Sequence, residues 1–213
     1  MFYWLYERML LSQIQELPRH ICFMISGADL AAEPGKCLEV TKWCTELNTL
    51  LAHKPVKAHE KLPPSIHGLT FHINKLTIDE LSRTLPAIKK ISSVARLVLH
   101  HGTTEEISGT GLDVVVAIGK SGKEEITDCI RRLAENGVPP SEIDEKTLES
   151  YLTFRYDPDI VVKSGGDHLT DFLIWQSVYS ELFFSDVNWK YFRRVDFLRV
   201  IRDYQSRIRR FGK

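Results

Sequence analysis

A chain of 213 residues, 43% of them hydrophobic and 26% charged, can bury a full core and has an ordinary globular composition. Its 28 Lys plus Arg residues balance 28 Asp plus Glu residues, so the net charge gives no information about a partner. We expect no nucleic-acid binding. No apolar run approaches the ~20 residues that a membrane span needs, and the start lacks the features of a signal peptide. We therefore expect a cytoplasmic protein, peripheral at any membrane it meets.

The first segment, residues 1–19, is predicted to form an N-terminal helix and a lead-in to one domain over residues 20–213. Residues 2–6 read F-Y-W-L-Y, a dense group of aromatic and apolar side chains. A helix of this kind either packs on the core or contacts a membrane surface, and the sequence leaves both alternatives open.

Short apolar runs alternate with helical patterns along the rest of the chain. Strands are expected at 20–26, 68–73, 95–101, 112–119 and 159–164, with a sixth near 182–184. Helices are expected at 35–52, 78–91, 123–135, 144–151, 170–180 and 196–209. The alternation predicts an α/β single domain with a mainly parallel, about six-stranded sheet flanked by helices. Such sheets bind ligands beyond the carboxyl ends of their strands, so the loops after Ser26, Ile73, Gly119 and Lys163 are the places to examine.

The last predicted helix has one apolar stripe and a basic end. The stripe consists of Phe197, Ile201, Tyr204, Ile208 and Phe211, which recur every three or four residues. Residues 193–213 hold seven Arg and one Lys against two Asp, a local excess of six positive charges. Charge concentrated in this way indicates contact with an anion, with a solvated basic face as the alternative.

Other motifs are weaker. The four cysteines (Cys22, Cys37, Cys44 and Cys129) lack metal-ligand spacing and are expected to be free thiols, at least in part buried. The G-K-S-G-K turn at 119–123 departs from a Walker phosphate loop, although a Gly- and Lys-rich turn at a helix start suits an anion.

A long and specific pattern lies in the last third of the chain. Residues 157–167 read D-P-D-I-V-V-K-S-G-G-D, and residues 172–189 read F-L-I-W-Q-S-V-Y-S-E-L-F-F-S-D-V-N-W. The chain closes with R-I-R-R-F-G at 207–212. These segments resemble the D-P-D-L-x-I-R-T, F-L-L-W-Q and R-x-R-R-F-G motifs of the cis-prenyltransferases, the undecaprenyl and dehydrodolichyl diphosphate synthases. The resemblance implies the cis-prenyltransferase fold.

The departures from that family pattern concern the catalytic residues. Where catalytic members read M-D-G-N-x-R, residues 25–30 read I-S-G-A-D-L. The resemblance implies that Ser26, Ala28 and Leu30 replace the family's Asp, Asn and Arg, which serve the magnesium–diphosphate. Lys163 stands where the family has an Arg. Because Mg²⁺ and arginines must absorb the charge of the leaving diphosphate, the sequence predicts no catalysis in cis and no metal bound by this chain alone.

The closing motif survives in Arg210, Phe211 and Gly212. In the family this element reaches across a dimer into the neighbour's site. The resemblance therefore implies a non-catalytic, activating subunit, like the Nogo-B receptor type, of a heteromeric enzyme that makes long-chain polyprenyl diphosphate for a glycosyl-carrier lipid. Its partner would retain M-D-G-N, hold most of the Mg²⁺ and share isopentenyl diphosphate with the tail. Lys163, Arg207 and Arg209 are further candidate anion contacts.

Dense aromatic residues predict the dimer surface. The expected interface residues are Phe172, Trp175, Tyr179, Glu181, Phe183, Phe184 and Trp189. Two other functions stay open. One is a divergent catalytic homodimer in which Asp29 is a shifted metal ligand, and the other is a lipid- or membrane-surface adaptor with the same fold.

Overall fold

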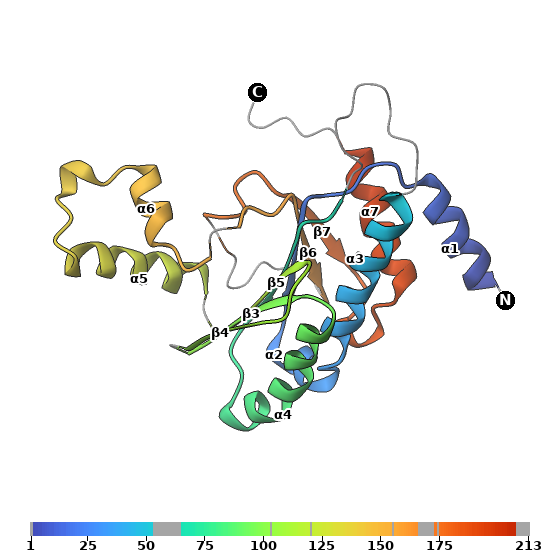
Figure 1. Cartoon of the computed structure of the whole chain (residues 1–213), viewed down its shortest axis with the longest axis horizontal. Coiled ribbons are helices and arrows are strands. Elements are labelled where there is room, and N and C mark those ends of the chain that lie inside the picture. The colour runs from blue at the N-terminus through green and yellow to red at the C-terminus, as the bar shows by residue number, and fades with distance from the viewer. Residues whose placement is uncertain are drawn as a thin grey trace.

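The computed structural model describes residues 2–52, 65–102, 104–119, 121–154, 156–165, 173 and 175–207. Its centre is a seven-stranded sheet in the order β4-β3-β5-β2-β1-β6-β7 (Figure 1). The strands are β1 His20–Ile25, β2 Gly68–Ile73, β3 Arg96–His101, β4 Thr104–Ser108, β5 Asp113–Ile118, β6 Ile160–Ser164 and β7 Glu181–Ser185. All neighbours pair in parallel except β3 and β4, so the predicted α/β class and mainly parallel sheet are confirmed.

The sequence missed one strand. β4 reads T-E-E-I-S and is exposed along most of its length, because it forms the antiparallel edge of the sheet. An edge strand with one solvated face has no continuous apolar run by which to recognise it. β1 and β2, by contrast, are buried at every residue, as expected for central parallel strands.

Helices cover the two faces of the sheet unequally. One face carries α2 Gly27–Ala32, α3 Lys36–Ala52, α4 Ile78–Lys89 and α7 Arg194–Ser206, with α1 Phe2–Gln13 against α7 (Figure 1). The pair α5 Gly122–Glu135 and α6 Glu145–Tyr151 extends from the opposite side. The two helices of this pair meet around Cys129, Leu133 and Leu152.

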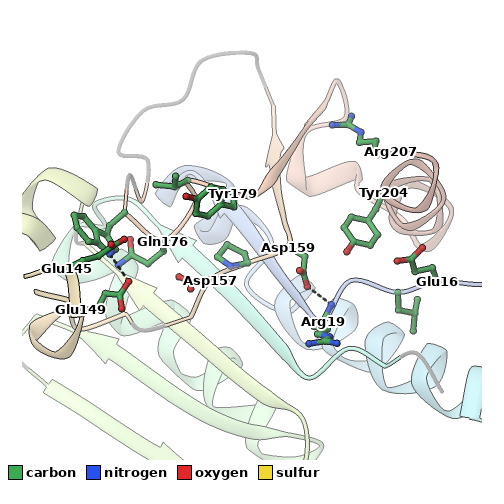
Figure 2. Close-up of a pocket in the computed structure, with 14 residues that line it drawn as sticks. Glu16, Arg19, Glu145, Glu149, Asp157, Asp159, Gln176, Tyr179, Tyr204 and Arg207 are labelled. Atoms are coloured by element: carbon green, nitrogen blue, oxygen red, sulfur yellow. Dashed lines mark hydrogen bonds between the residues drawn. The ribbon is translucent and has the colours of Figure 1, made fainter. Parts of the chain in front are cut away.

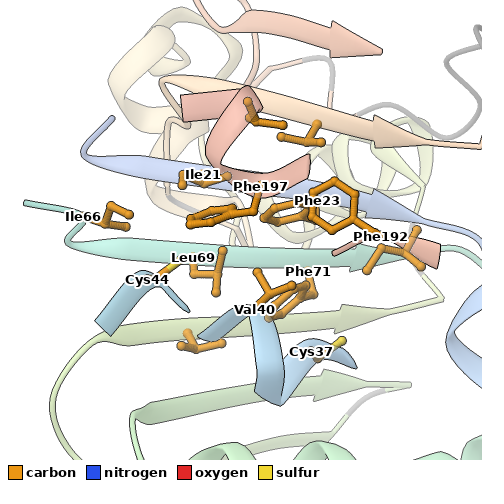
Figure 3. Close-up of a cluster of buried hydrophobic side chains, with 14 of the residues drawn as sticks. Ile21, Phe23, Cys37, Val40, Cys44, Ile66, Leu69, Phe71, Phe192 and Phe197 are labelled. Carbon is orange, nitrogen blue, oxygen red and sulfur yellow. The ribbon is translucent and has the colours of Figure 1, made fainter. Parts of the chain in front are cut away.

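The core lies mainly between the sheet and α3 and α7 (Figure 3). Phe197, Ile201 and Tyr204 of the predicted stripe are buried, which confirms the facing of α7, whereas Ile208 and Phe211 lie outside the described residues. The four cysteines are free and buried, as predicted. The expected helix at 170–180 is wrong where it can be assessed, because residues 175–179 form turns.

The N-terminal segment forms the predicted helix, α1. Leu10 of α1 and Ile14, directly after the helix, are fully buried in the core, whereas Tyr3, Trp4 and Leu5 are exposed. Over the described residues, no helix is both long and apolar enough to cross a membrane.

Candidate functional site

The loop after β1 folds back on itself through Ser26. The Ser26 Oγ caps α2 by accepting the Asp29 backbone N–H at 3.1 Å, and it donates to Asp29 Oδ2 at 2.6 Å. Serine is a preferred N-cap because its side-chain oxygen satisfies a helix N–H that has no intrahelical partner. The two polar groups that could face a ligand here are therefore bonded to one another.

Gly27 and Asn74 join this loop to the loop after β2. The Gly27 backbone N–H donates to Asn74 Oδ1, and a Cβ at position 27 would lie 2.3 Å from the Lys75 carbonyl oxygen. Only glycine permits this approach of two backbones. The sequence singled out Ser26, Ala28 and Leu30 but missed the role of Asn74, for which an Asn directly after a buried strand was the available signal.

Leu30 is fully buried in the core, and Ala28 is exposed at the start of α2. Burial of Leu30 stabilises the fold, since burying a leucine side chain contributes roughly 1.5–3 kcal/mol to the free energy of folding. The position at which the family motif has an arginine thus serves packing in this chain.

Below the loop, aromatic rings fill the space between the sheet and the helices (Figure 3). Phe23, Phe71, Trp189 and Phe192 are each at most 1% exposed, and the Phe23 ring centroid lies 5.7 Å from those of Trp189 and Phe192. These distances are those of packed aromatic pairs. The predicted interface role of Trp189 is therefore corrected, because its side chain belongs to the chain's own core.

A small cavity separates the carboxyl ends of β1, β2 and β6. It measures about 10 Å³ and is lined by Met24, Ile25, Ser26, His72, Asn74 and Lys163. That volume is close to the minimum for one water molecule and far below a diphosphate. The Lys163 Nζ, an expected anion contact, donates to the Ser164 carbonyl oxygen at 3.1 Å.

The turn after β5 is also closed by the chain itself. The Ser121 side chain accepts the Glu124 backbone N–H, and the Glu124 carboxylate accepts the Ser121 backbone N–H. A carboxylate therefore occupies the start of α5. The hydrogen bond from the Ser121 backbone, and then that from its side chain, lower the pKa of Glu124. The Lys75 Nζ lies 3.6 Å from Glu124 Oε1. A glutamate held here competes with any external anion.

The donor set does not fit a magnesium ion. Mg²⁺ binds oxygen ligands, chiefly carboxylates, in a near-octahedral arrangement. In the loop after β1, which the structure describes throughout, Asp29 supplies the carboxylate nearest the strand end; it accepts from Ser26 and is the proposed shifted ligand. Within the described ranges, no cluster of three or more His, Cys, Asp or Glu side chains could hold a metal.

A much larger cavity, of about 840 Å³, lies at the amino ends of β1 and β6 (Figure 2). Side chains from α6, α7, the lead-in to β1 and the turns after residue 173 line it. Its charged members are Glu16, Arg19, Glu145, Glu149, Asp157, Asp159 and Arg207, and Trp175, Tyr179 and Tyr204 supply rings. Burial, and secondarily the charge of Glu149, raises the pKa of Asp157. An excess of carboxylates makes this cavity unsuited to a diphosphate.

Two of these charged residues have internal roles. Asp159 Oδ2 accepts the backbone N–H groups of Arg19 and His20, at 2.6 and 3.0 Å. Arg207 donates to Asp203 at 2.7 Å, to Glu181 at 3.3 Å and to the Leu182 carbonyl oxygen at 2.8 Å. The guanidinium of Arg207, which the sequence predicted to contact an anion, is thus held by two carboxylates of the chain itself.

The other predicted interface residues fall into different environments. Tyr179 and Phe184 are exposed, and Phe184 lies on the edge strand β7. Trp175 is partly buried beside the α5–α6 cluster, and Phe183 packs against the main core. Phe172 and the tail residues Arg209, Arg210, Phe211 and Gly212 lie outside the described residues.

Comparison with known proteins identifies the class to which this fold and this strand-end loop belong. The family described as "Putative undecaprenyl diphosphate synthase" matches residues 81–212. "Isoprenyl transferase 1" of Corynebacterium efficiens is 31% identical, over 100% of this chain and 98% of its own length. The geranylgeranyl-diphosphate-specific tritrans,polycis-undecaprenyl-diphosphate synthase of Methanocaldococcus jannaschii is also 31% identical, over 98% of this chain and 88% of its own.

A solved structure agrees on the fold. Lavandulyl diphosphate synthase from Lavandula x intermedia, in complex with dimethylallyl diphosphate, superposes with a TM-score of 0.68 over 92% of this chain and 99% of its own, at 18% identity. The chain belongs to the undecaprenyl diphosphate synthase family of cis-prenyltransferases. The relatives named above are transferases and diphosphate synthases.

Proposed function

We propose that this chain is the non-catalytic, activating subunit of a heteromeric cis-prenyltransferase that makes long-chain polyprenyl diphosphate for a glycosyl-carrier lipid. One observation carries the proposal. At the end of β1, Ser26 and Asp29 are bonded to one another, and Leu30 is buried in the core. Among the described residues, the loop that resembles the family's M-D-G-N-x-R motif therefore presents no free carboxylate–arginine pair.

The cavity beside this loop supports the same conclusion. It holds about 10 Å³ between the ends of three strands, so a diphosphate could enter only if the strand-end loops moved apart. Such movement would break the Gly27–Asn74 bond and disturb the buried Leu30. In this proposal the Mg²⁺ and both substrates occupy the partner's site, where the partner retains M-D-G-N.

This chain's contribution is its C-terminal tail. Arg210 would contact isopentenyl diphosphate in the partner's site, and the backbone N–H of Gly212 would approach it without a side chain in between. Phe211 lies between these two residues in the sequence. The surface that includes Tyr179 and Phe184 would form the contact with the partner, since both side chains are exposed.

A second candidate function is a divergent catalytic homodimer. The observation in its favour is the full-length match, at 31% identity, to a relative named as a transferase. In that case Asp29 would have to leave Ser26 and recruit a metal together with groups from another chain.

The experiment that separates the two candidates is an assay of the purified chain. Radiolabelled isopentenyl diphosphate, an allylic diphosphate and Mg²⁺ are incubated with this chain alone, with a family member that retains M-D-G-N, and with both. We expect no product from this chain alone, and product at the full rate only when both chains are present. The two chains should also co-elute on size exclusion. Steady product formation by this chain alone would replace the proposal with the catalytic homodimer.

A further inference from the structure

The large cavity at the amino ends of β1 and β6 carries more negative than positive charge (Figure 2). Five carboxylates and two arginines line it, an excess of three negative charges. One of the two arginines, Arg207, is already paired with Asp203 and Glu181, which lie outside the lining. The wall is therefore more acidic toward an occupant than its composition alone indicates.

Three of the lining carboxylates stand without a cation. Within the described part of the chain, Glu145, Glu149 and Asp157 form no ion pair, and Glu149 Oε1 accepts the Trp175 indole N–H at 3.4 Å. Burial first, and then the charge of Glu149, raise the pKa of Asp157. Carboxylates that face one another in this way favour a cationic occupant, because a cation removes their repulsion.

The same wall supplies aromatic rings. Trp175, Tyr179 and Tyr204 line the cavity, and Figure 2 shows Tyr179 and Tyr204 on opposite sides of Asp159. Tyr179 and its neighbour Val178 are each 64% exposed. Of the cationic side chains, arginine suits such a wall best, because its planar guanidinium pairs with carboxylates and also stacks on aromatic rings.

The chain itself brings arginines to this wall. Arg207 follows the last residue of α7, lines the cavity and has an extended backbone, with φ −89° and ψ 140°. Its guanidinium donates to Asp203 at 2.7 Å and to Glu181 at 3.3 Å, so one arginine of this segment is already held by carboxylates. Arg209 and Arg210 follow within three residues, which span at most about 11 Å. Both can therefore reach the cavity without any change in α7.

Residues 208–213, which we call the tail, match the cavity in charge. They read I-R-R-F-G-K, with three cations and no acidic side chain. Ile208 and Phe211 can contact the apolar part of the wall, which consists of Leu17, Pro158 and Val178. A short tether gives an effective concentration on the order of millimolar, so even an affinity of roughly 100 µM fills the cavity about nine-tenths of the time.

We propose that the tail docks in the acidic cavity of its own chain, with its guanidinium groups against Glu149 and Asp157. Docking is a property of the isolated chain and does not depend on the proposed function. Its consequence does rest on that function, because a tail held in this cavity is withheld from a partner's site until the partner displaces it.

The test is binding of a fluorescein-labelled peptide, with the sequence of residues 208–213, to the full chain, measured by fluorescence anisotropy. The docked tail competes with the peptide in the unmodified chain. Arg209→Gln with Arg210→Gln, the neutral-tail variant, should free the cavity and raise the apparent affinity about tenfold. The matched control, Arg83→Gln with Arg131→Gln, removes two exposed arginines elsewhere and should bind the peptide as weakly as the unmodified chain does.

A second pair of variants locates the bound peptide. In the neutral-tail variant, the further changes Glu149→Gln with Asp157→Asn should lower the affinity at least about tenfold. The control changes Glu135→Gln with Asp79→Asn remove two exposed carboxylates outside the cavity and should leave the affinity as it was. Circular dichroism checks that every variant is folded. A peptide in which both arginines are replaced by glutamine should bind the neutral-tail variant at least about tenfold more weakly.

Equal peptide affinities of the unmodified chain and the neutral-tail variant would overturn the proposal, as would equal affinities of the two carboxylate variants. A dimer of the unmodified chain on light scattering that the neutral-tail variant no longer forms would also overturn it, because the tail would then occupy the cavity of a second copy. Each of these results leaves the proposed function standing, since the readout is peptide binding by the isolated chain and not prenyl transfer by a complex.

Discussion

The cavities at the two ends of the parallel strands, which we call the carboxyl edge and the amino edge, differ in size and charge. At the carboxyl ends of β1, β2 and β6, the side on which α/β sheets usually bind ligands, a cavity of about 10 Å³ lies between Ser26, Asn74 and Lys163. At the amino edge, a cavity of about 840 Å³ opens between α6 and α7, with carboxylates such as Glu149 and Asp157 in its wall. The larger cavity is poorly suited to a diphosphate, because five carboxylates and two arginines line it.

The loop at the carboxyl end of β1 is held closed by contacts within the chain. The carboxyl-edge loop is stabilised by the Ser26 cap, the Gly27–Asn74 bond and the burial of Leu30. Each of these contacts favours a closed loop. A loop that binds a ligand needs polar groups that are held without being mutually satisfied, which costs stability.

The largest expected effect tests the closed edge. Leu30→Arg places the family's residue type at a fully buried position, where a charge without a partner costs about 3–5 kcal/mol. Urea unfolding followed by circular dichroism should show this loss, whereas Leu30→Met should cost less than about 1.5 kcal/mol. A stable Leu30→Arg protein would mean that the loop can open, which would favour the catalytic homodimer.

The next prediction concerns the amino edge and its pH dependence. Burial lowers the pKa of His20 to about 4, and its ring accepts or donates to Thr70 Oγ1 at 2.8 Å and stacks on Tyr156. The unfolded histidine titrates near 6.5, so its contribution is complete above that pH and is lost as the pH falls toward 4. The total is about 3 kcal/mol, at ~1.4 kcal/mol per pKa unit.

His20→Gln should therefore flatten the fall in unfolding free energy between pH 7 and pH 4. The measurement is urea unfolding at half-unit intervals of pH. His67→Gln, at an exposed position in the same part of the chain, serves as the control and should keep the original slope. Parallel slopes for all three proteins would show that His20 is not the group responsible.

A smaller effect is expected from the tail. Deleting residues 210–213 removes Arg210 and Gly212 and should lower product formation by the two-chain complex roughly tenfold to a hundredfold. That range corresponds to one lost charge-assisted contact, about 1.5–3 kcal/mol. Deleting Lys213 alone is the control. The two chains should still co-purify, and near-normal turnover by an intact truncated complex would refute the role of the tail.

The smallest change is expected at the carboxyl edge. Ser26→Asp restores the family's carboxylate but leaves Ala28 and Leu30 in place, so the isolated chain should gain no measurable activity. The new carboxylate also faces Asp29 in place of the present 2.6 Å hydrogen bond. Product assays with and without Mg²⁺ test this prediction, and a clear Mg²⁺-dependent gain would show that one carboxylate is sufficient.

By itself, the sequence determined the features that depend on local pattern. The buried runs at β1, β2 and β5 and the apolar stripe of α7 were visible because burial imposes a period on the chain. The motifs of the last third indicated the family. The replacements at Ser26, Ala28 and Leu30 were equally visible, since each departs from a fixed motif.

Only the tertiary structure decided which polar groups are already bonded within the chain. Arg207, at the end of α7, looked like a free cation but pairs with Glu181 of β7, and Trp189 looked like an interface residue but packs against Phe23 and Phe71. The acidic cavity unites segments around residues 16, 149, 157 and 207 that are far apart in sequence. Such pairings depend on how the chain packs across long separations, and no local period in the sequence records them.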